Sequence, residues 1–342
     1  MAALSKLPLR QLGRNGPLVP RLGLGSTGAS GIYNAPLSEA DHLAFLDEAY
    51  NRGETFWDTA DKYGASEDVL GKWFAANPDK RENIFLSIKF GIILTPGQSP
   101  PFKVAPPEYC REAIEASLHP LNLPYVNVYY VHRLDKVTPI EKTMEAMEKS
   151  NSLSECSAES LRRAYAVHPI TAVQVEFSLF CGTIESSQTR LLETARKLGV
   201  TIVCYSPPGN GFLTNTIRSR GDVKPGDSRV HLPWLKEEDL DKDVPVVEKI
   251  AGIAALKGFS SAQLALAWLL AQGDDIFPIP GTSRANRLVE NLESVRVSVS
   301  TDEDKALWEI ADAVVGTQFQ GTTGYAFSDT PATHPSTVRR MF

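Results

Sequence analysis

The sequence predicts an (α/β)8 TIM barrel with an N-terminal β-hairpin. Short apolar runs typical of strands alternate with amphipathic helical stretches from residue 19 to about residue 290. The alternation repeats about eight times, and eight such units close naturally into a parallel barrel. The strands are apolar on both faces, as expected when helices cover one side and side chains fill the interior.

The expected elements follow in chain order. Residues 9–23 are typical of a hairpin around Arg14-Asn15-Gly16, which would plug the bottom of the barrel. Helical spacing of apolar residues predicts helices over 39–53, 107–121, 157–168 and 187–199. Strands, of which the fifth is weak, are expected at 19–26, 55–60, 84–90, 126–132, 152–155, 172–178, 201–207 and 276–281.

One barrel domain is expected over residues 1–316, followed by a C-terminal tail over 317–342. The tail is rich in Thr, Ser and Pro, which favours an extended or disordered segment. A polar insertion over 208–245 separates the seventh and eighth strands and ends in the charged run KEEDLDKD. A loop of that length is usually functional or mobile.

The composition narrows the class of protein. The chain has 342 residues, of which 42% are apolar, and a net charge of −6. This charge argues against nucleic acid or an anionic membrane as a partner. No apolar run approaches the ~20 residues that span a bilayer, and the N-terminus lacks the apolar segment of a secretory signal. Four scattered cysteines without CxxC spacing predict a reduced cytoplasmic protein without metal or disulfides, and the oligomeric state stays open.

Four polar residues lie where apolar strands run into loops: Asp58, Tyr63, Lys89 and His132. A tyrosine pKa near ~10 is too high for acid–base work at neutral pH, but a nearby ammonium favours the phenolate. Tyr63 as general acid, Lys89 as its tuner, Asp58 as the anchor of that lysine and His132 as substrate orienter form a coherent set. Singly, these residues have ordinary alternatives: a turn cap, half-buried packing, a solvated charge and a rim residue.

A second pattern follows the last strand. Gly281, Thr282, Ser283 and Arg284 open a helical segment that also contains Arg287. Backbone N–H groups at a helix N-terminus with two arginines suit an anionic phosphate. The alternative is a surface helix with solvated arginines. No GxGxxG opens a βαβ unit, so a Rossmann domain is not supported.

These motifs resemble the aldo-keto reductase family, in particular its longer pyridoxal-reductase and auxin-induced types. The resemblance covers roughly residues 8–315. The matching segments, in order, are FWDTADKYG (56–64), SEDVLGKWF (66–74), SIKFG (87–91), YYVHRLD (129–135), AVQVEFSLF (172–180), VCYSPPGNGFL (203–213) and PIPGTSRANRLVENL (278–292).

The resemblance implies an NADPH-dependent oxidoreductase (EC 1.1.1.-) that reduces aldehydes or ketones, with small carbonyl substrates and Tyr63 as general acid. It places the 2′-phosphate of NADPH/NADP+ at the arginine segment and the adenine near Glu290 and Asn291. Ser154 and Gln174 would hydrogen-bond the nicotinamide carboxamide, although an interior hydrogen bond would also explain Gln174. Tyr205 would stack on the nicotinamide ring. Ser206 and Gly211 belong to a phosphate-side loop in which Asn210 replaces a usual arginine, so weaker pyrophosphate binding is expected.

The chain departs from the family pattern before Ser154. The connection from the fourth helix is short, as if residues were deleted around 148–153, which predicts a shortened or missing fifth strand. Reduced stability and a disturbed contact at Ser154 would follow, because a closed barrel cannot lose a strand without exposing two edges. The alternative reading is therefore an NADPH-binding barrel with impaired or no catalysis, a regulatory protein or a splice or gene-model variant. A Schiff-base aldolase using Lys89 is a third reading, against which Tyr63, His132 and the phosphate motif argue.

Overall fold

A closed parallel β-sheet forms the centre of the molecule. The computed structural model describes residues 7–31, 33, 37–94, 102–104, 106–147, 151–224, 226–232, 235–314 and 326–332. Eight strands pair in the order β12-β11-β10-β9-β8-β5-β4-β3. Their bounds are Leu24–Gly25 (β3), Phe56–Asp58 (β4), Phe85–Phe90 (β5), Val128–Val131 (β8), Asn151–Ser154 (β9), Ala172–Glu176 (β10), Thr201–Tyr205 (β11) and Ile276–Pro278 (β12).

The first and last strands close the sheet on itself. The Gly23 N–H donates to the Pro278 carbonyl at 2.9 Å, and the Gly25 N–H donates to the Pro280 carbonyl at 3.3 Å. Gly25 also forms a parallel bridge with Gly281. The predicted eight-stranded α/β barrel is therefore confirmed.

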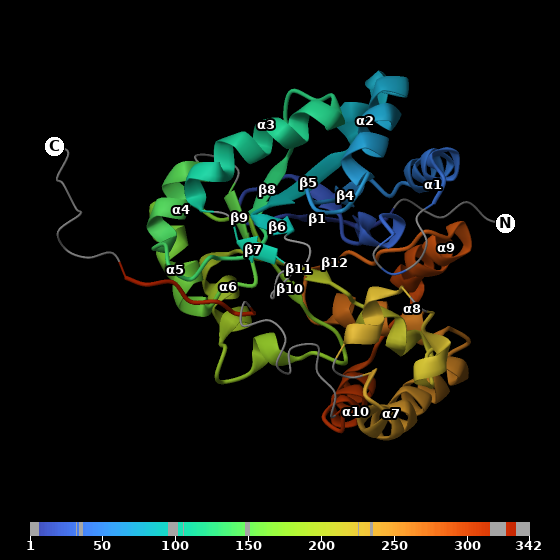
Figure 1. Cartoon of the computed structure of the whole chain (residues 1–342). Coiled ribbons are helices and arrows are strands. Elements are labelled where there is room, and N and C mark those ends of the chain that lie inside the picture. Colours follow the sequence, from blue (N-terminus) through green and yellow to red (C-terminus); the bar gives the residue numbers. More distant parts are fainter. Residues whose placement is uncertain are drawn as a thin grey trace.

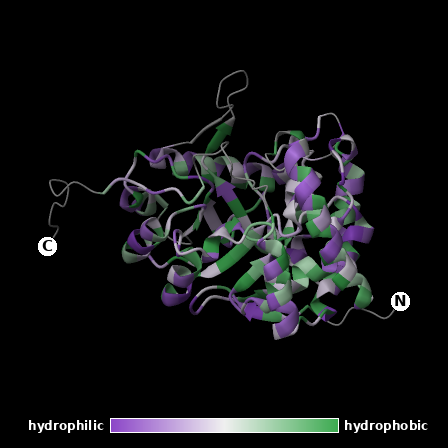
Figure 2. Ribbon diagram, turned by 90° about the horizontal axis from the view of Figure 1, so that it is seen from below, coloured by the Kyte–Doolittle hydropathy of each residue, from purple (hydrophilic) through white to green (hydrophobic). Residues whose placement is uncertain are grey.

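Helices surround the barrel (Figure 1). Their bounds are Glu39–Asn51 (α1), Ser66–Ala76 (α2), Cys110–Leu121 (α3), Ile140–Met147 (α4), Ala158–Val167 (α5), Leu191–Leu198 (α6), Glu237–Leu256 (α7), Ser261–Ala271 (α8), Ala285–Glu293 (α9) and Thr301–Ala311 (α10). Figure 2 shows hydrophobic strands at the centre and hydrophilic residues on the helices around them. A separate hairpin of Ile92–Leu94 (β6) and Phe102–Val104 (β7) follows the strand β5.

The N-terminal hairpin pairs Leu9–Gln11 (β1) with Leu18–Pro20 (β2) and plugs one end of the barrel, as predicted. Leu12 and Val19 are fully or nearly fully buried and belong to a cluster with Phe56, Val128 and residues of three further strands. The Gly13 N–H also donates to the Thr201 hydroxyl at 2.7 Å. The expected single strand over 19–26 is wrong in one respect, because β2 belongs to the hairpin and only Leu24–Gly25 joins the barrel.

The fifth barrel strand is present as β9. Leu153 pairs with Val131 of β8 on one side and with Val173 of β10 on the other. Two outcomes were expected here: recruitment of residues 149–153 as a short polar strand, or a missing strand. The structure supports the first, because Asn151–Ser154 forms β9, which has the same length as β8. The shorter chain before Ser154 is accommodated because Asn151–Ser154 is recruited as the strand. Residues 148–150, which belong to the suspected deletion, lie outside the described residues.

Two expectations about loops need refinement. The charged run that was assigned to the end of the 208–245 insertion lies in the first turns of α7, which begins at Glu237. Short 3-10 helices occupy Gly209–Thr214, Arg220–Asp222 and Ser228–His231. Most of the tail lies outside the described residues, but residues 326–332 pack on the barrel, with Ser328 and Thr330 buried. This segment is therefore folded onto the domain, although the 316/317 boundary itself stays a prediction.

Within the described residues, no single helix has the length and apolar character needed to cross a membrane. The bent pair α7 and α8 meets such a requirement by length and composition alone, and α8 is largely buried inside the protein.

Candidate active site

Strand alternation places the predicted polar residues at one end of the barrel interior. Inward-facing Phe56, Val128 and Ala172 belong to the apolar cluster at the hairpin end. Successive inward positions along a strand are two residues apart. The next inward positions toward the carboxyl ends are therefore polar. They are Asp58 after Phe56, Gln174 after Ala172, and Tyr130 followed by His132 after Val128. The carboxyl ends of barrel strands form the catalytic face of this fold.

Asp58 lies at the centre of a buried hydrogen-bond network. Its Oδ1 accepts from the Lys89 ammonium, and both side chains are almost completely buried, at 2% and 0% exposed. Its Oδ2 accepts from the Ser87 hydroxyl and from Gln174 Nε2, each at 2.8 Å. Three donors therefore fix the carboxylate, and Asp58 holds Lys89 as the sequence suggested. Gln174 makes the interior hydrogen bond that was the alternative explanation for its position.

Tyr63, Lys89 and His132 lie side by side. Lys89 Nζ is 5.2 Å from the centre of the Tyr63 ring. The Tyr63 and His132 rings meet edge to face with their centres 5.9 Å apart. Burial, reinforced by the positive charges of Lys62, Arg133 and Lys89, holds the pKa of His132 well below its usual value. His132 is therefore a neutral imidazole at physiological pH, and its Nδ1 has no partner among the described residues.

A cavity of about 530 Å³ opens beside these residues. Of the predicted site residues, only Lys89 does not line it, because Lys89 is buried behind Tyr63 and Asp58. The predicted residues that do line it are Asp58, Tyr63, His132, Ser154, Gln174, Tyr205, Ser206, Gly211, Gly281, Thr282, Ser283, Arg284, Arg287, Glu290 and Asn291. Its volume is within the range of small-molecule and cofactor sites.

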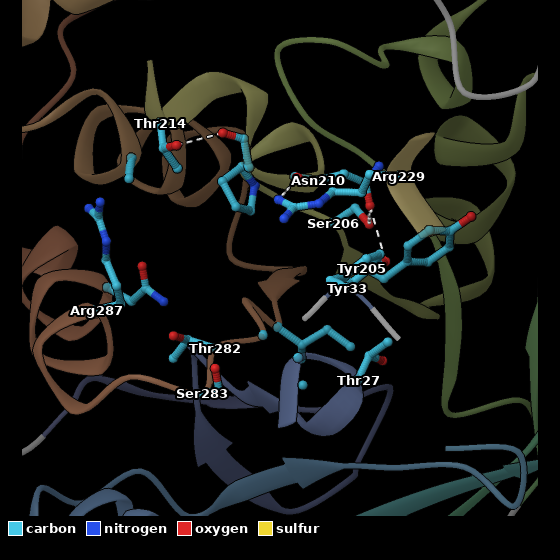
Figure 3. Close-up of a pocket in the computed structure, with 18 of the residues that line it drawn as sticks. Thr27, Tyr33, Tyr205, Ser206, Asn210, Thr214, Arg229, Thr282, Ser283 and Arg287 are labelled. Atoms are coloured by element: carbon cyan, nitrogen blue, oxygen red, sulfur yellow. Dashed lines mark hydrogen bonds between the residues drawn. The ribbon is translucent and has the colours of Figure 1, made fainter. Parts of the chain in front are cut away.

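The cavity also reaches the start of the helix α9. The helix α9 begins at Ala285, and the side chain of its N-cap residue, Arg284, makes no capping hydrogen bond. In the first turn, the Arg287 N–H donates to Asn286 Oδ1 at 2.9 Å. Arg284 and Arg287 lie at this helix end, and Arg287 pairs with Glu290 at 2.5 Å. A Cβ atom on Gly28 would lie 3.0 Å from Thr282 N, so the absence of a side chain at Gly28 favours the close approach of the two backbones. Figure 3 shows Thr282, Ser283 and Arg287 together on this side of the cavity.

The opposite wall contains residues that the sequence reasoning missed. The Tyr33 and Ser206 hydroxyls both donate to Asn210 Oδ1, at 3.2 and 2.8 Å. Arg229, which pairs with Asp227, donates to the Asn210 carbonyl at 3.1 Å. Figure 3 shows Arg229 across the cavity from Arg287. A cation thus lies beside Asn210, where the expected arginine is absent, but it comes from a position 19 residues further along the chain.

Lys62 and Arg133 were also missed, although each adjoins a predicted residue. Arg133 donates to the Ser154 hydroxyl at 3.2 Å, so Ser154 is engaged even without a ligand. Lys62 lines the main cavity and a second one of about 340 Å³ that also contains Asp61 and Glu67. Burial lowers the pKa of Lys62 to about 8 and raises the pKa of Glu67 to about 7. A lysine and an arginine are common surface residues, so nothing in the sequence indicated that Lys62 and Arg133 line the cavity.

The fold and the site together define a barrel enzyme whose polar cavity lies at the carboxyl ends of the strands. The sequence profile of the Aldo/keto reductase family matches residues 21–312. The chain belongs to the aldo/keto reductase family and is an oxidoreductase of that family.

Individual relatives agree with this assignment. Aldo-keto reductase yakc [NADP(+)] of Schizosaccharomyces pombe is 40% identical over 338 residues, 95% of this chain and 98% of its own. Aldo-keto reductase str7 of Strobilurus tenacellus is 40% identical over 319 residues, 90% of this chain and 92% of its own. A thermostable aldo-keto reductase solved with the inhibitor epalrestat superposes with a TM-score of 0.68 at 25% identity, covering 89% of this chain and 100% of its own.

Proposed function

We propose that this protein reduces aldehydes or ketones to alcohols with NADPH, as an enzyme of class EC 1.1.1.-, with Tyr63 as the general acid. The observation that carries the proposal is one continuous cavity. Tyr63 and His132 line it together with Arg284 and Arg287 at the start of the helix α9. A dinucleotide that carries a reactive ring at one end and phosphates at the other matches this arrangement.

The residues at the phosphate end fit NADP(H), the cofactor that aldo-keto reductases use. The N–H groups at the start of α9 and the side chains of Arg284 and Arg287 would hold the 2′-phosphate. Glu290 and Asn291 line the same end and would contact the adenine. Ser206 and Gly211 would face the pyrophosphate. At the other end, Ser154 and Gln174 would hold the carboxamide, with Tyr205 against the ring. When bound, NADPH supplies the hydride for the reduction.

The protein's own residues supply the proton and the orientation. Tyr63 would donate its hydroxyl proton to the carbonyl oxygen as the alcohol forms. Lys89 lies against the Tyr63 ring and stabilises the negative charge that the phenolate then carries. Asp58 keeps that ammonium in place. His132, which is neutral, can hydrogen-bond the carbonyl oxygen and orient it.

The alternative, a barrel that binds NADPH without useful turnover, rested on a deletion around residues 148–153 that would shorten or remove the fifth strand. That strand pairs with both neighbours, and no observation in the structure favours impaired catalysis. We further propose a cytoplasmic location. All four cysteines are buried and none forms a disulfide, which is compatible with a reducing compartment.

Titration with NADPH, followed by turnover with 4-nitrobenzaldehyde, tests the proposal. We expect quenching of protein fluorescence on binding, and NADPH oxidation that consumes one aldehyde per cofactor. Binding without turnover of this aldehyde or of a wider carbonyl panel would instead support the non-catalytic alternative. Absence of binding would contradict both.

Replacing Arg229 by methionine is expected to raise the Kd for both NADPH and NADH by about tenfold. Its guanidinium lies so close to Gly211 that a Cβ there would be 3.0 Å from Arg229 Nη1. The Arg229 guanidinium thus lies beside the residues proposed to face the pyrophosphate, a group that NADPH and NADH both contain. Fluorescence titration measures the two constants. A selective loss of NADPH would place Arg229 at the 2′-phosphate instead.

A further inference from the structure

Residues 326–332 lie against the fifth strand–helix unit of the barrel, far in sequence from the residues they contact. Ser328 forms a parallel bridge with Cys156. The Ser328 N–H donates to the Glu155 carbonyl, and the Ser157 N–H donates to the Ser328 carbonyl, both at 2.8 Å. Ser328 therefore acts as a short additional strand at the point where β9 runs into α5.

Side chains reinforce this attachment. Asp329 Oδ1 accepts from the hydroxyls of Ser157, the N-cap of α5, at 3.0 Å and of Ser160 in its first turn at 2.9 Å. Arg163 donates to the carbonyls of Thr330 and Pro331, at 2.8 and 2.7 Å. The Arg163 guanidinium also pairs with Glu141 of α4 at 2.7 Å. The segment is thus tied to two helices as well as to the strand end.

Glu155, whose carbonyl accepts from the Ser328 N–H, directly follows Ser154. Glu155 is fully buried and has φ 54°, a left-handed conformation that costs a non-glycine residue free energy. Its N–H donates to the Gln174 carbonyl at 3.1 Å, and its Oε1 accepts from the Glu176 N–H at 3.0 Å. The bond from the Ser328 N–H to the Glu155 carbonyl is a third hydrogen bond to this residue. Residues 326–332 therefore help to hold Glu155 in its left-handed conformation.

Both neighbours of this turn line the cavity. Ser154 precedes Glu155, and Gln174 is bonded to it through the backbone. A shift of the Glu155 backbone would move both side chains at the end of the cavity where Tyr63 and His132 lie. Residues 326–332 do not line the cavity themselves, so they act on it through the residues they contact. Among these, Glu155 follows Ser154 directly and bonds to Gln174.

We propose that residues 326–332 are a positioning segment of the cofactor site, which holds the Ser154–Glu155 turn and thereby presents Ser154 and Gln174 to the nicotinamide end of NADPH. The role toward NADPH rests on the proposed function, whereas the role in holding the turn stands on the structure alone. Because coupling between two sites is reciprocal, NADPH must also tighten the docking of the segment.

The double variant Asp329→Ala/Thr330→Val tests this proposal. It removes the acceptors of the Ser157 and Ser160 hydroxyls and of the Ile140 N–H. In the ligand-free full-length protein we expect faster hydrogen exchange at the amides of Glu155 and Glu176. These amides bond to the barrel and not to the tail, so they report on the turn. We also expect the Kd for NADPH to rise about tenfold, within the usual range of coupled sites.

Two further variants keep the result interpretable. Asp312→Ala removes an exposed carboxylate at the end of α10 and should leave exchange and Kd unchanged. Ser160→Ala removes one of the two hydroxyl contacts to Asp329 and should give a smaller change in the same direction. If the double variant fails to fold, Ser160→Ala tests the same attachment with a smaller change.

The outcomes separate the two levels of the proposal. Unchanged exchange at Glu155 and Glu176 would show that the segment does not hold the turn, and would overturn the inference. Faster exchange with an unchanged Kd would overturn its link to the cofactor site. If the unaltered protein does not bind NADPH, the proposed function fails, and the exchange comparison alone decides whether the segment positions the turn.

Discussion

Replacing Tyr63 by phenylalanine is expected to lower kcat for carbonyl reduction by about 10²–10⁴-fold, the usual contribution of a positioned general acid. The substitution removes only the hydroxyl, so the ring can keep its contact with His132 and its place beside Lys89. NADPH binding should persist because Tyr63 is not among the residues proposed to hold the 2′-phosphate, the adenine or the pyrophosphate.

Steady-state kinetics with NADPH and 4-nitrobenzaldehyde, together with fluorescence titration of the cofactor, give kcat and Kd separately. Tyr125→Phe is a matched control, because Tyr125 is exposed and does not line the cavity. Turnover by Tyr63→Phe at the rate of the unaltered protein would rule out Tyr63 as the acid. A loss of NADPH binding of the same size as the loss of turnover would indicate a structural role instead.

The second large effect is expected at the other end of the cavity. Replacing both Arg284 and Arg287 by leucine should weaken NADPH binding by about 100-fold or more, since two hydrogen bonds to a charged group are lost and each contributes roughly 1.5–3 kcal/mol. The net loss is smaller than the sum of the two bonds, because in the unaltered protein Arg287 must give up its pairing with Glu290 to bind the phosphate. NADH lacks the 2′-phosphate, so its Kd should change much less.

The ratio of the two dissociation constants is the decisive measurement, because general damage to the site would affect both cofactors. Arg296→Leu provides a control: it removes an arginine of the same type just beyond α9, outside the cavity. Equal weakening of NADPH and NADH in the double variant would contradict the assignment of these arginines to the 2′-phosphate. Together with Arg229→Met, the comparison separates the phosphate that only NADPH carries from those that both cofactors share.

Much of the candidate site could be predicted because its residues stand at strand ends. Asp58 and His132 each continue an apolar inward-facing row. Lys89 follows Phe85 and Ser87 on the inward face of β5. Parallel strands of one barrel bring such positions to one edge. Arg229 could not be predicted in the same way. Its guanidinium reaches Asn210 only because the insertion after β11 folds back through three short 3-10 helices, and no local pattern specifies that path.

The fifth strand shows where a comparison of segment lengths is misleading. A short connection suggested a lost strand, yet Asn151–Ser154 pairs on both sides. The unpaired edges of β8 and β10 would be costly, so the barrel recruits a polar segment that has no strong strand signal of its own. Whether the shortening lowers stability stays a prediction, which melting temperatures before and after lengthening this connection would test.

By itself, the sequence determined the alternation that leads to a closed barrel, the family, and which polar residues face its interior, because strand periodicity and helix periodicity are local properties of the chain. Only the tertiary structure decided that Gln174 bonds Asp58, that Arg229 lies beside Asn210, and that residues 326–332 lie on Glu155. These contacts join residues 19 to 173 positions apart. They depend on loop paths and side-chain packing, which no local pattern encodes.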